Sequence, residues 1–338
     1  MRKVDVASAA ALPRGRPIRV LALLSGICIV AVSQAMADPE AAGATATGDP
    51  SQTSLPEVTV RARRDALAPQ VRAFVSESLY LENDEGPARW NSPVCPAVVG
   101  LAHDQGEFVV ARLSQIARAA GVPLAGERCA LPNLVVFVTS EPQSFLTKWS
   151  KRHRQRVFGG DVRPKDIQAF IDTPMAVRVW YNSSLAAATG ARQSDEHALP
   201  GLFGGGTAAS GKGGDFGARA PYFVGPDLDS RITRSAVWSL TSAFVVVDAS
   251  RLQGVKIGQL ADYLGMYTFA RLKTGAHHGN APTILGLFQG APAQSPPGLT
   301  PWDDAFLEAL YHTDPRLVQQ RGMMVSRMVS HIVPGTPR

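Results

Sequence analysis

The residues most capable of chemistry are an adjacent histidine pair, His277-His278, in a Gly-rich turn that follows an apolar segment. Imidazole nitrogens bind transition metals, but two neighbouring histidines need a third ligand, and the spacing of the other side chains identifies none. A solvent-exposed turn is the commoner setting for such a pair. We therefore keep His277 and His278 as weak binding candidates, predict no metal site and no cofactor, and assign no catalytic residue.

A second motif, Gly206 to Lys212, fits the first seven positions of a phosphate-binding loop. The eighth position should carry a Ser or Thr hydroxyl for magnesium, and here it is Gly213. A working loop also joins a buried strand to a helix N-terminus, whereas this one lies inside a Gly-rich stretch. We expect no nucleotide binding. The chain also has no Gly-x-Ser-x-Gly elbow, so a serine hydrolase has no anchor in the sequence.

Five cations fall within nine residues, between Lys148 and Arg156, with Trp149 and His153 among them. The five are Lys148, Lys151, Arg152, Arg154 and Arg156. Such a cluster could hold an anionic lipid, a polysaccharide or a nucleic acid. A solvated helix face is the more frequent explanation, and the deciding fact is whether the charges converge on one face.

The first 37 residues have the three parts of a secretory signal peptide. A basic region precedes an apolar core from Val20 to Val32, and Ala35-Met36-Ala37 forms a small-x-small cleavage site. Ile27 before Cys28 argues against a lipid-attachment site. No later stretch reaches the roughly 20 apolar residues of a membrane-spanning helix. We therefore expect a soluble protein exported to the periplasm or the medium.

Export would also change the charge and the cysteine count of the chain. Residues 1–37 contain five cations and one acid, so their removal lowers the formal net charge from +6 to +2 and makes a nucleic-acid partner unlikely. Cys95 and Cys129 are then the only thiols left. In an oxidising compartment, such a pair is predicted to form one disulfide bond. Two cysteines alone make no zinc site.

The remaining chain is predicted to be a flexible leader at 38–64 and one globular α/β (α+β) domain at 65–333. Within the leader, Leu55 to Arg64 resembles a short segment of TonB-dependent outer-membrane receptors; an extended basic strand is the alternative reading. A Gly-rich insertion at about 189–221 has little apolar surface to bury, and its composition favours disorder. The expected core elements are these: helices at 69–79, 105–120, 145–149, 165–171, 257–272, 302–311 and 316–332, and strands at 134–139, 177–182 and 243–248.

Three segments together resemble zinc metalloproteases of the zincin type, and in particular an uncharacterised family of bacterial secreted proteins expected to have that fold. The segments are Asp262 to Gly265 at a helix end, Pro282 to Leu285 with Phe288, and Leu299 to Asp303 leading to Leu310-Tyr311. In such zincins, a His-Glu-x-x-His helix ends in an apolar-Gly turn, and a Ser-Ile-Met turn lies beneath the metal. The resemblance implies a mixed sheet with a central helix.

The metal-binding residues of that family are missing from this chain. Anchored on Leu264-Gly265, the first ligand position is Gly258, the catalytic Glu position is Gln259, and the second ligand position is Asp262. Glycine cannot bind zinc, and a neutral amide cannot act as a general base. The resemblance therefore implies a degenerate member that keeps the scaffold without the hydrolytic centre.

We expect a non-catalytic binding protein for a peptide or an envelope protein. An envelope enzyme with an unrecognised catalytic site, in which Asp248, Asp262 and the His277-His278 pair converge, is one alternative. An accessory to an outer-membrane receptor, suggested by Leu55 to Arg64 alone, is another.

Overall fold

The computed structural model describes residues 55–82, 86–126, 129, 131–160, 162–187, 233–234 and 236–334. All of these residues belong to one compact unit, Ser51–Arg338. The expected signal peptide, the leader up to residue 54, the Gly-rich insertion and the Gly206 to Lys212 motif lie outside the described residues.

Five strands of the described chain form one mixed sheet, which confirms the predicted α/β class. The strands are β1 (Arg89–Trp90), β2 (Pro96–Val99), β3 (Leu134–Thr139), β4 (Val177–Ala187) and β5 (Ala236–Asp248). β5 is the central strand: β1 and β3 pair in parallel with its first and second halves, and β2 extends the sheet beyond β3. β4 pairs antiparallel with β5 along its full length.

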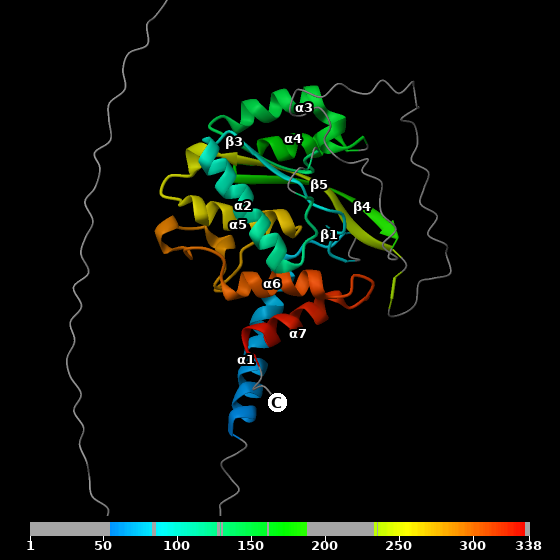
Figure 1. Cartoon of the computed structure of the whole chain (residues 1–338), viewed down its shortest axis with the longest axis vertical. Helices are drawn as coiled ribbons and strands as arrows, with labels where there is room; N and C mark the ends of the chain where they lie inside the picture. The colour runs from blue at the N-terminus through cyan, green and yellow to red at the C-terminus, as the bar shows by residue number, and fades with distance from the viewer. Residues whose placement is uncertain are drawn as a thin grey trace, which may run out of the picture. The chain divides into compact units, whose positions relative to one another are not determined.

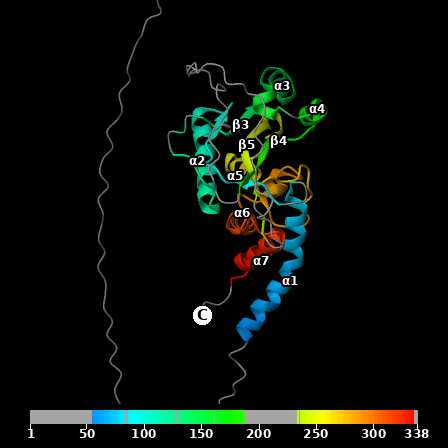
Figure 2. The ribbon, with the colours of Figure 1, turned by 90° about the vertical axis from the view of Figure 1, so that its right-hand side faces the viewer.

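Helices cover both faces of this sheet (Figure 1). They are α1 (Leu55–Ser78), α2 (His103–Ala120), α3 (Pro142–Phe158), α4 (Pro164–Asp172), α5 (Ile257–Phe269), α6 (Pro301–His312) and α7 (Gln320–Ile332). β3 shows why both faces are covered, because its side chains alternate between two apolar clusters. Val136 packs with α2 and α5, whereas Val135 and Phe137 pack with α3 and α4. On the α2 and α5 side, α6 and α7 form a further layer and α1 contacts α7 (Figure 2).

Local sequence explains where two of these helices begin and end. α2 ends at Gly121, whose φ of 83° is the left-handed conformation that glycine adopts without strain. α6 begins at Thr300, whose hydroxyl accepts a hydrogen bond from the Asp303 amide while the Asp303 carboxylate accepts one from the Thr300 amide. Pro301 occupies the first helical position, where the missing amide hydrogen costs nothing.

α5 is the central helix, and its residues from Gln259 to Phe269 are all buried. A helix end leaves its last carbonyl groups without partners, which is costly inside a protein. Three aromatic side chains supply the missing donors. The Trp90 indole donates to Thr268 O at 2.7 Å, the Tyr181 hydroxyl to Tyr267 O at 2.5 Å, and the Tyr311 hydroxyl to Phe269 O at 2.6 Å. These bonds join β1, β4 and α6 to the end of α5.

Two expectations from the sequence are wrong. Leu55 to Arg64 is not a flexible or extended leader segment, because it forms the first turns of α1. The Arg64 guanidinium donates to O of Val333, the residue that follows α7, at 2.8 Å. Within this segment, Val58 is 63% exposed, so the helix forms there without burial of that side chain. Gly265 does not end its helix either, since α5 continues to Phe269. A Cβ at Gly265 would lie 2.6 Å from Ile116 Cδ1, so glycine allows α2 and α5 to approach closely.

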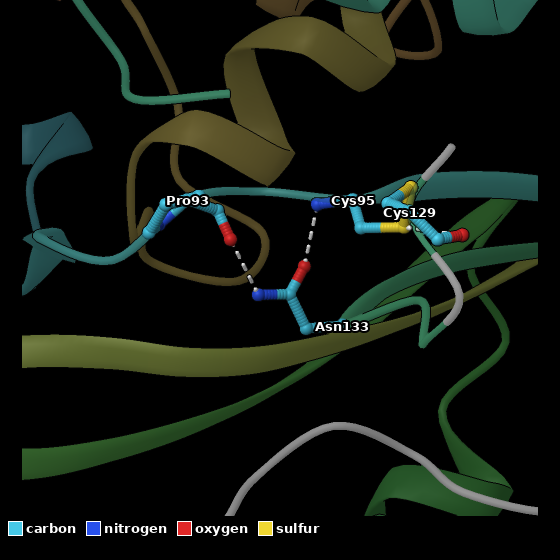
Figure 3. Close-up of a disulfide and its surroundings, with 4 residues drawn as sticks. All are labelled: Pro93, Cys95, Cys129 and Asn133. Atoms are coloured by element: carbon cyan, nitrogen blue, oxygen red, sulfur yellow. Dashed lines mark hydrogen bonds between the residues drawn. A yellow bond between two sulfur atoms is a disulfide. The ribbon is translucent and has the colours of Figure 1, made fainter. Parts of the chain in front are cut away.

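The predicted disulfide bond between Cys95 and Cys129 is present, with the two Cα atoms 5.9 Å apart. Asn133 fixes the chain beside it, as Figure 3 shows: its side-chain amide donates to Pro93 O at 3.1 Å and accepts from the Cys95 amide at 2.8 Å. Cys95 precedes β2 and Cys129 precedes β3, so the bond ties together the approaches to two paired strands.

Candidate functional site

Gly258 and Gln259, where the resemblance to zincins would place a metal ligand and the catalytic Glu, lie in the first turn of α5. Space around Gly258 is open, with no atom within 4 Å of the position a Cβ would take. The Gln259 amide caps the helix by accepting from the Lys256 amide at 3.1 Å, and it donates to Pro296 O at 2.9 Å. Gln259 therefore holds the following loop against the helix.

Asp262, which the resemblance places at the second ligand position, is 3% exposed and forms an ion pair with Arg112. The Arg112 guanidinium of α2 reaches Asp262 Oδ1 at 2.5 Å, and the Leu299 amide donates to Asp262 Oδ2 at 2.9 Å. The hydrogen bond that Arg112 donates to Asp262 raises the pKa of Arg112. A Cβ at Gly298 would lie 2.5 Å from Asp262 Oδ2, so glycine lets the loop approach the carboxylate. Asp262 thus joins α2, α5 and the loop before α6.

The three segments that resemble zincins do meet in space. Asp303, fully buried at the start of α6, accepts from the Thr283 hydroxyl and from the Ile284 amide, the latter at 2.9 Å. The 3₁₀ turn η3 (Ile284–Gly286) in turn contacts α5. Burial raises the pKa of Asp303, while the hydrogen bonds from Thr283, Ile284 and Thr300 oppose that change.

The two histidines point to different surroundings and share no site. His277 is exposed, whereas His278 is 4% exposed and its Nδ1 lies 2.9 Å from the Ser78 hydroxyl of α1. His278 Nε2 has no hydrogen-bond partner among the described residues. Burial, with a smaller contribution from His277, lowers the pKa of His278 to about 4. Within the described ranges, no three His, Cys, Asp or Glu side chains gather closely enough to hold a metal ion.

The basic cluster lies on α3, which is kinked at His153 (φ −126°, ψ 21°). Lys148, Lys151 and Arg152 are exposed before the kink, at the i, i+3 and i+4 spacing that places them on one helix face. Arg154 follows the kink and donates to Val162 O at 3.0 Å. The cations therefore converge only in part.

A cavity of about 560 Å³ follows strand β4. Five consecutive residues of the strand, from Val177 to Tyr181, line it. Neighbouring side chains of a strand point to opposite faces of the sheet, so a single cavity contacts all five only along the edge of the strand. One wall comes from α4 through Phe170 and Thr173, and the other comes from Tyr267 and residues 271–274.

Backbone register shows which β4 groups face this cavity. Val177 pairs with Val247, and the Asp248 amide donates to Ala176 O at 2.8 Å. Hydrogen-bonded and non-bonded pairs alternate in antiparallel strands, so Val177, Val179 and Tyr181 turn their amides and carbonyls away from β5. The Ala243 amide, opposite Tyr181, accordingly donates toward β3, to Asn133 O. Among the described residues, β5 is the only strand that pairs with β4.

A second cavity, of about 460 Å³, continues the first one past the start of β4. The two share Met175, Val177 and Tyr267. Aromatic and apolar side chains line the second cavity, including Tyr263 and Phe288, whose rings meet edge to face at 4.9 Å. We call the two cavities together the β4 groove. Of the binding candidates and the segments that carry the zincin resemblance, four residues line it: Tyr263, His277, Leu285 and Phe288.

Sequence reasoning found β4 as a strand but missed the groove. The VRVWYN run alternates as a half-buried strand does, and nothing in it tells whether the strand is central or at an edge. Tyr80 and Arg271, which meet at the groove wall with the guanidinium 4.3 Å from the ring centroid, are far apart in the chain.

Comparisons of the chain with protein-family models, with curated proteins and with solved structures find no match. In the part of the chain that the structure describes, no helix is long and apolar enough to cross a membrane.

Proposed function

We propose that this is an exported, non-catalytic binding protein that holds an extended peptide segment in the β4 groove, on a scaffold like that of a degenerate zincin. The observation that carries the proposal is the outer edge of β4, with which no described strand pairs. Val177, Val179 and Tyr181 direct their backbone donors and acceptors into a groove wide enough to be lined from both sides. A peptide added to a sheet edge gains main-chain hydrogen bonds there, and side-chain pockets add selectivity.

The scaffold part of the proposal is supported by the junction around α5. Asp303 joins the Thr283 turn to the start of α6. Asp262 joins α5 to Leu299, in the loop that precedes α6. These are the segments on which the resemblance to zincins depends. Export is supported by the disulfide bond between Cys95 and Cys129, because such bonds persist in oxidising compartments.

The test selects ligands from a displayed library of random peptides and titrates a labelled hit by fluorescence anisotropy. Val179→Pro removes one outward backbone donor without removing a bond to β5, and Val179→Ala is the matched control that keeps the donor. We expect Val179→Pro to weaken binding by about tenfold or more and Val179→Ala to change it by less than about threefold. Thermal unfolding of both variants checks that the fold is intact.

The peptide itself gives a second readout. In a strand added to β4, alternate amides point toward β4, so N-methylation should weaken binding at every second position only. Equal binding to the wild-type protein and to Val179→Pro, or loss of binding without this alternation, would contradict peptide pairing at the edge.

A further inference from the structure

The β4 groove carries an unbalanced set of charges. Its described lining includes four cations and no Asp or Glu side chain: Arg178, Arg251, Arg271 and Lys273. Two of these have carboxylate partners outside the lining. Arg251 lies 3.3 Å from Asp248, and Arg271 forms an ion pair with Glu82. Arg178 and Lys273 are left without a paired carboxylate among the described residues.

Arg178 is the more informative of the two, because it is only 6% exposed. Its guanidinium donates to Ile171 O at 2.7 Å and lies 3.5 Å from the Gln143 side-chain oxygen. Asp248 and Asp172 act on it only from a distance, and burial lowers its pKa. A buried cation without a paired anion is costly to the free protein. A carboxylate brought by a ligand would offset that cost.

The opposite wall of the groove also presents positive charge. Lys273 is exposed and its ammonium group donates to Ser76 O at 2.7 Å. Arg271 is held in place by Glu82, by the Ser183 hydroxyl at 2.9 Å and by the Tyr80 ring. Cations thus line both walls, from Arg178 in β4 to Lys273 after α5. Successive side chains of an extended peptide point to opposite sides, so neighbouring residues of a bound segment reach both walls.

We infer that the occupant of the β4 groove is an acidic extended segment, with Asp or Glu side chains facing Arg178 and Lys273. This inference rests on the proposed peptide-binding function and adds the chemical class of the ligand. Charge complementarity of this kind sets which partner binds and how fast it associates.

The experiment compares three peptides of equal length and equal apolar content, carrying Glu, Gln or Lys at the two central positions. Binding to the full chain is measured by fluorescence anisotropy at low and at near-physiological ionic strength. We expect the Glu peptide to bind most tightly and the Lys peptide least, with the difference shrinking as salt screens the charges.

Two protein variants locate the effect. Lys273→Gln should weaken the Glu peptide by about two- to fivefold, as expected for an exposed ion pair, and leave the Gln peptide unchanged. Lys151→Gln, which removes the same charge on α3 outside the groove, is the matched control and should change neither peptide.

The outcomes separate this inference from the function on which it rests. If all three peptides bind equally and Val179→Pro still abolishes binding, the groove holds peptides without selecting acidic ones, and the inference fails alone. If Glu peptides bind the wild-type protein and Val179→Pro alike, peptide pairing at β4 fails as well. An anionic polysaccharide that binds through Lys273 but ignores Val179→Pro would also overturn the inference.

Discussion

At the scale of single residues, two buried carboxylates that could serve in catalysis, Asp262 and Asp303, instead form structural hydrogen bonds. Asp262 lies between Arg112 and the Leu299 amide, and Asp303 accepts bonds from Thr283 and Ile284. His278 differs from these residues. It is buried with one nitrogen bonded to Ser78 and the other without a partner among the described residues, which makes its protonation unfavourable in the folded state.

This setting predicts a loss of stability in mild acid. The pKa of His278 is lowered to about 4 in the folded protein, against 6.5 for an ordinary histidine. Between these two pH values the unfolded chain binds the additional proton, so the free energy of unfolding falls as pH falls, with a slope of up to about 1.4 kcal/mol per pH unit. Urea unfolding of the wild type and of His278→Gln measures the difference.

The glutamine variant should be less sensitive to pH than the wild type across this range. His277→Gln, at the neighbouring exposed position, is the matched control and should follow the wild type. Identical pH profiles for the wild type and His278→Gln would show that His278 is not the titrating group.

At the scale of secondary structure, one disulfide bond and one edge strand define the two borders of the sheet. Cys95–Cys129 and Asn133 hold the start of β2 against β3 at one border. Among the described strands, β4 forms the other border, with its outer backbone groups facing the groove. A free edge tends to pair with other chains, so a groove with walls on both sides restricts which chains can reach it.

Removal of the disulfide bond should destabilise the protein substantially. The bond closes a loop with a sequence separation of 34 residues. Such a loop corresponds to about 3 to 4 kcal/mol in the free energy of unfolding, in the chain-entropy model. Chemical denaturation of the Cys95→Ser, Cys129→Ser double variant against the oxidised wild type measures this loss. Mass spectrometry of alkylated, non-reduced exported protein should find no free thiols, and two free thiols there would contradict both the bond and the export proposal.

At the scale of the whole molecule, the residues at the start of α5 do not supply a zinc centre to the proposed metalloprotease-like scaffold. Gly258 has no side chain to bind zinc, and Gln259 uses its amide to cap the helix and hold Pro296. We therefore expect no zinc-dependent peptidase activity. The purified protein is incubated with zinc and a mixed peptide library, with and without a chelator, and the products are read by mass spectrometry.

Chelator-sensitive cleavage that disappears in Asp262→Ala would contradict the proposed non-catalytic function. Because this variant leaves Arg112 without its partner, its fold is checked by thermal unfolding. Arg112→Ala serves as the comparison, since it breaks the same ion pair but keeps the carboxylate. Loss of cleavage in both variants would point to a structural effect, and loss in Asp262→Ala alone would point to metal binding.

Much of the fold follows from local patterns in the sequence. Strand β3 has the predicted bounds, Leu134 to Thr139, because a short apolar run with three valines favours a buried strand. Gly121 ends α2, and Thr300-Pro301 begins α6, where capping depends on residues close together in the chain. The pairing of Cys95 with Cys129 follows from their number and from the expected compartment.

Only the tertiary structure decides where these elements lie relative to one another. The VRVWYN pattern specifies a strand, but its position at the sheet edge depends on long-range pairing with β5. The contact of Arg271 with Tyr80 and of Arg112 with Asp262 likewise joins residues far apart in the chain. Arg64, in the first turns of α1, bonds to Val333 at the far end of the chain. Local spacing determines the type of an element, whereas burial and pairing between distant segments determine which of its groups remain free to bind a ligand.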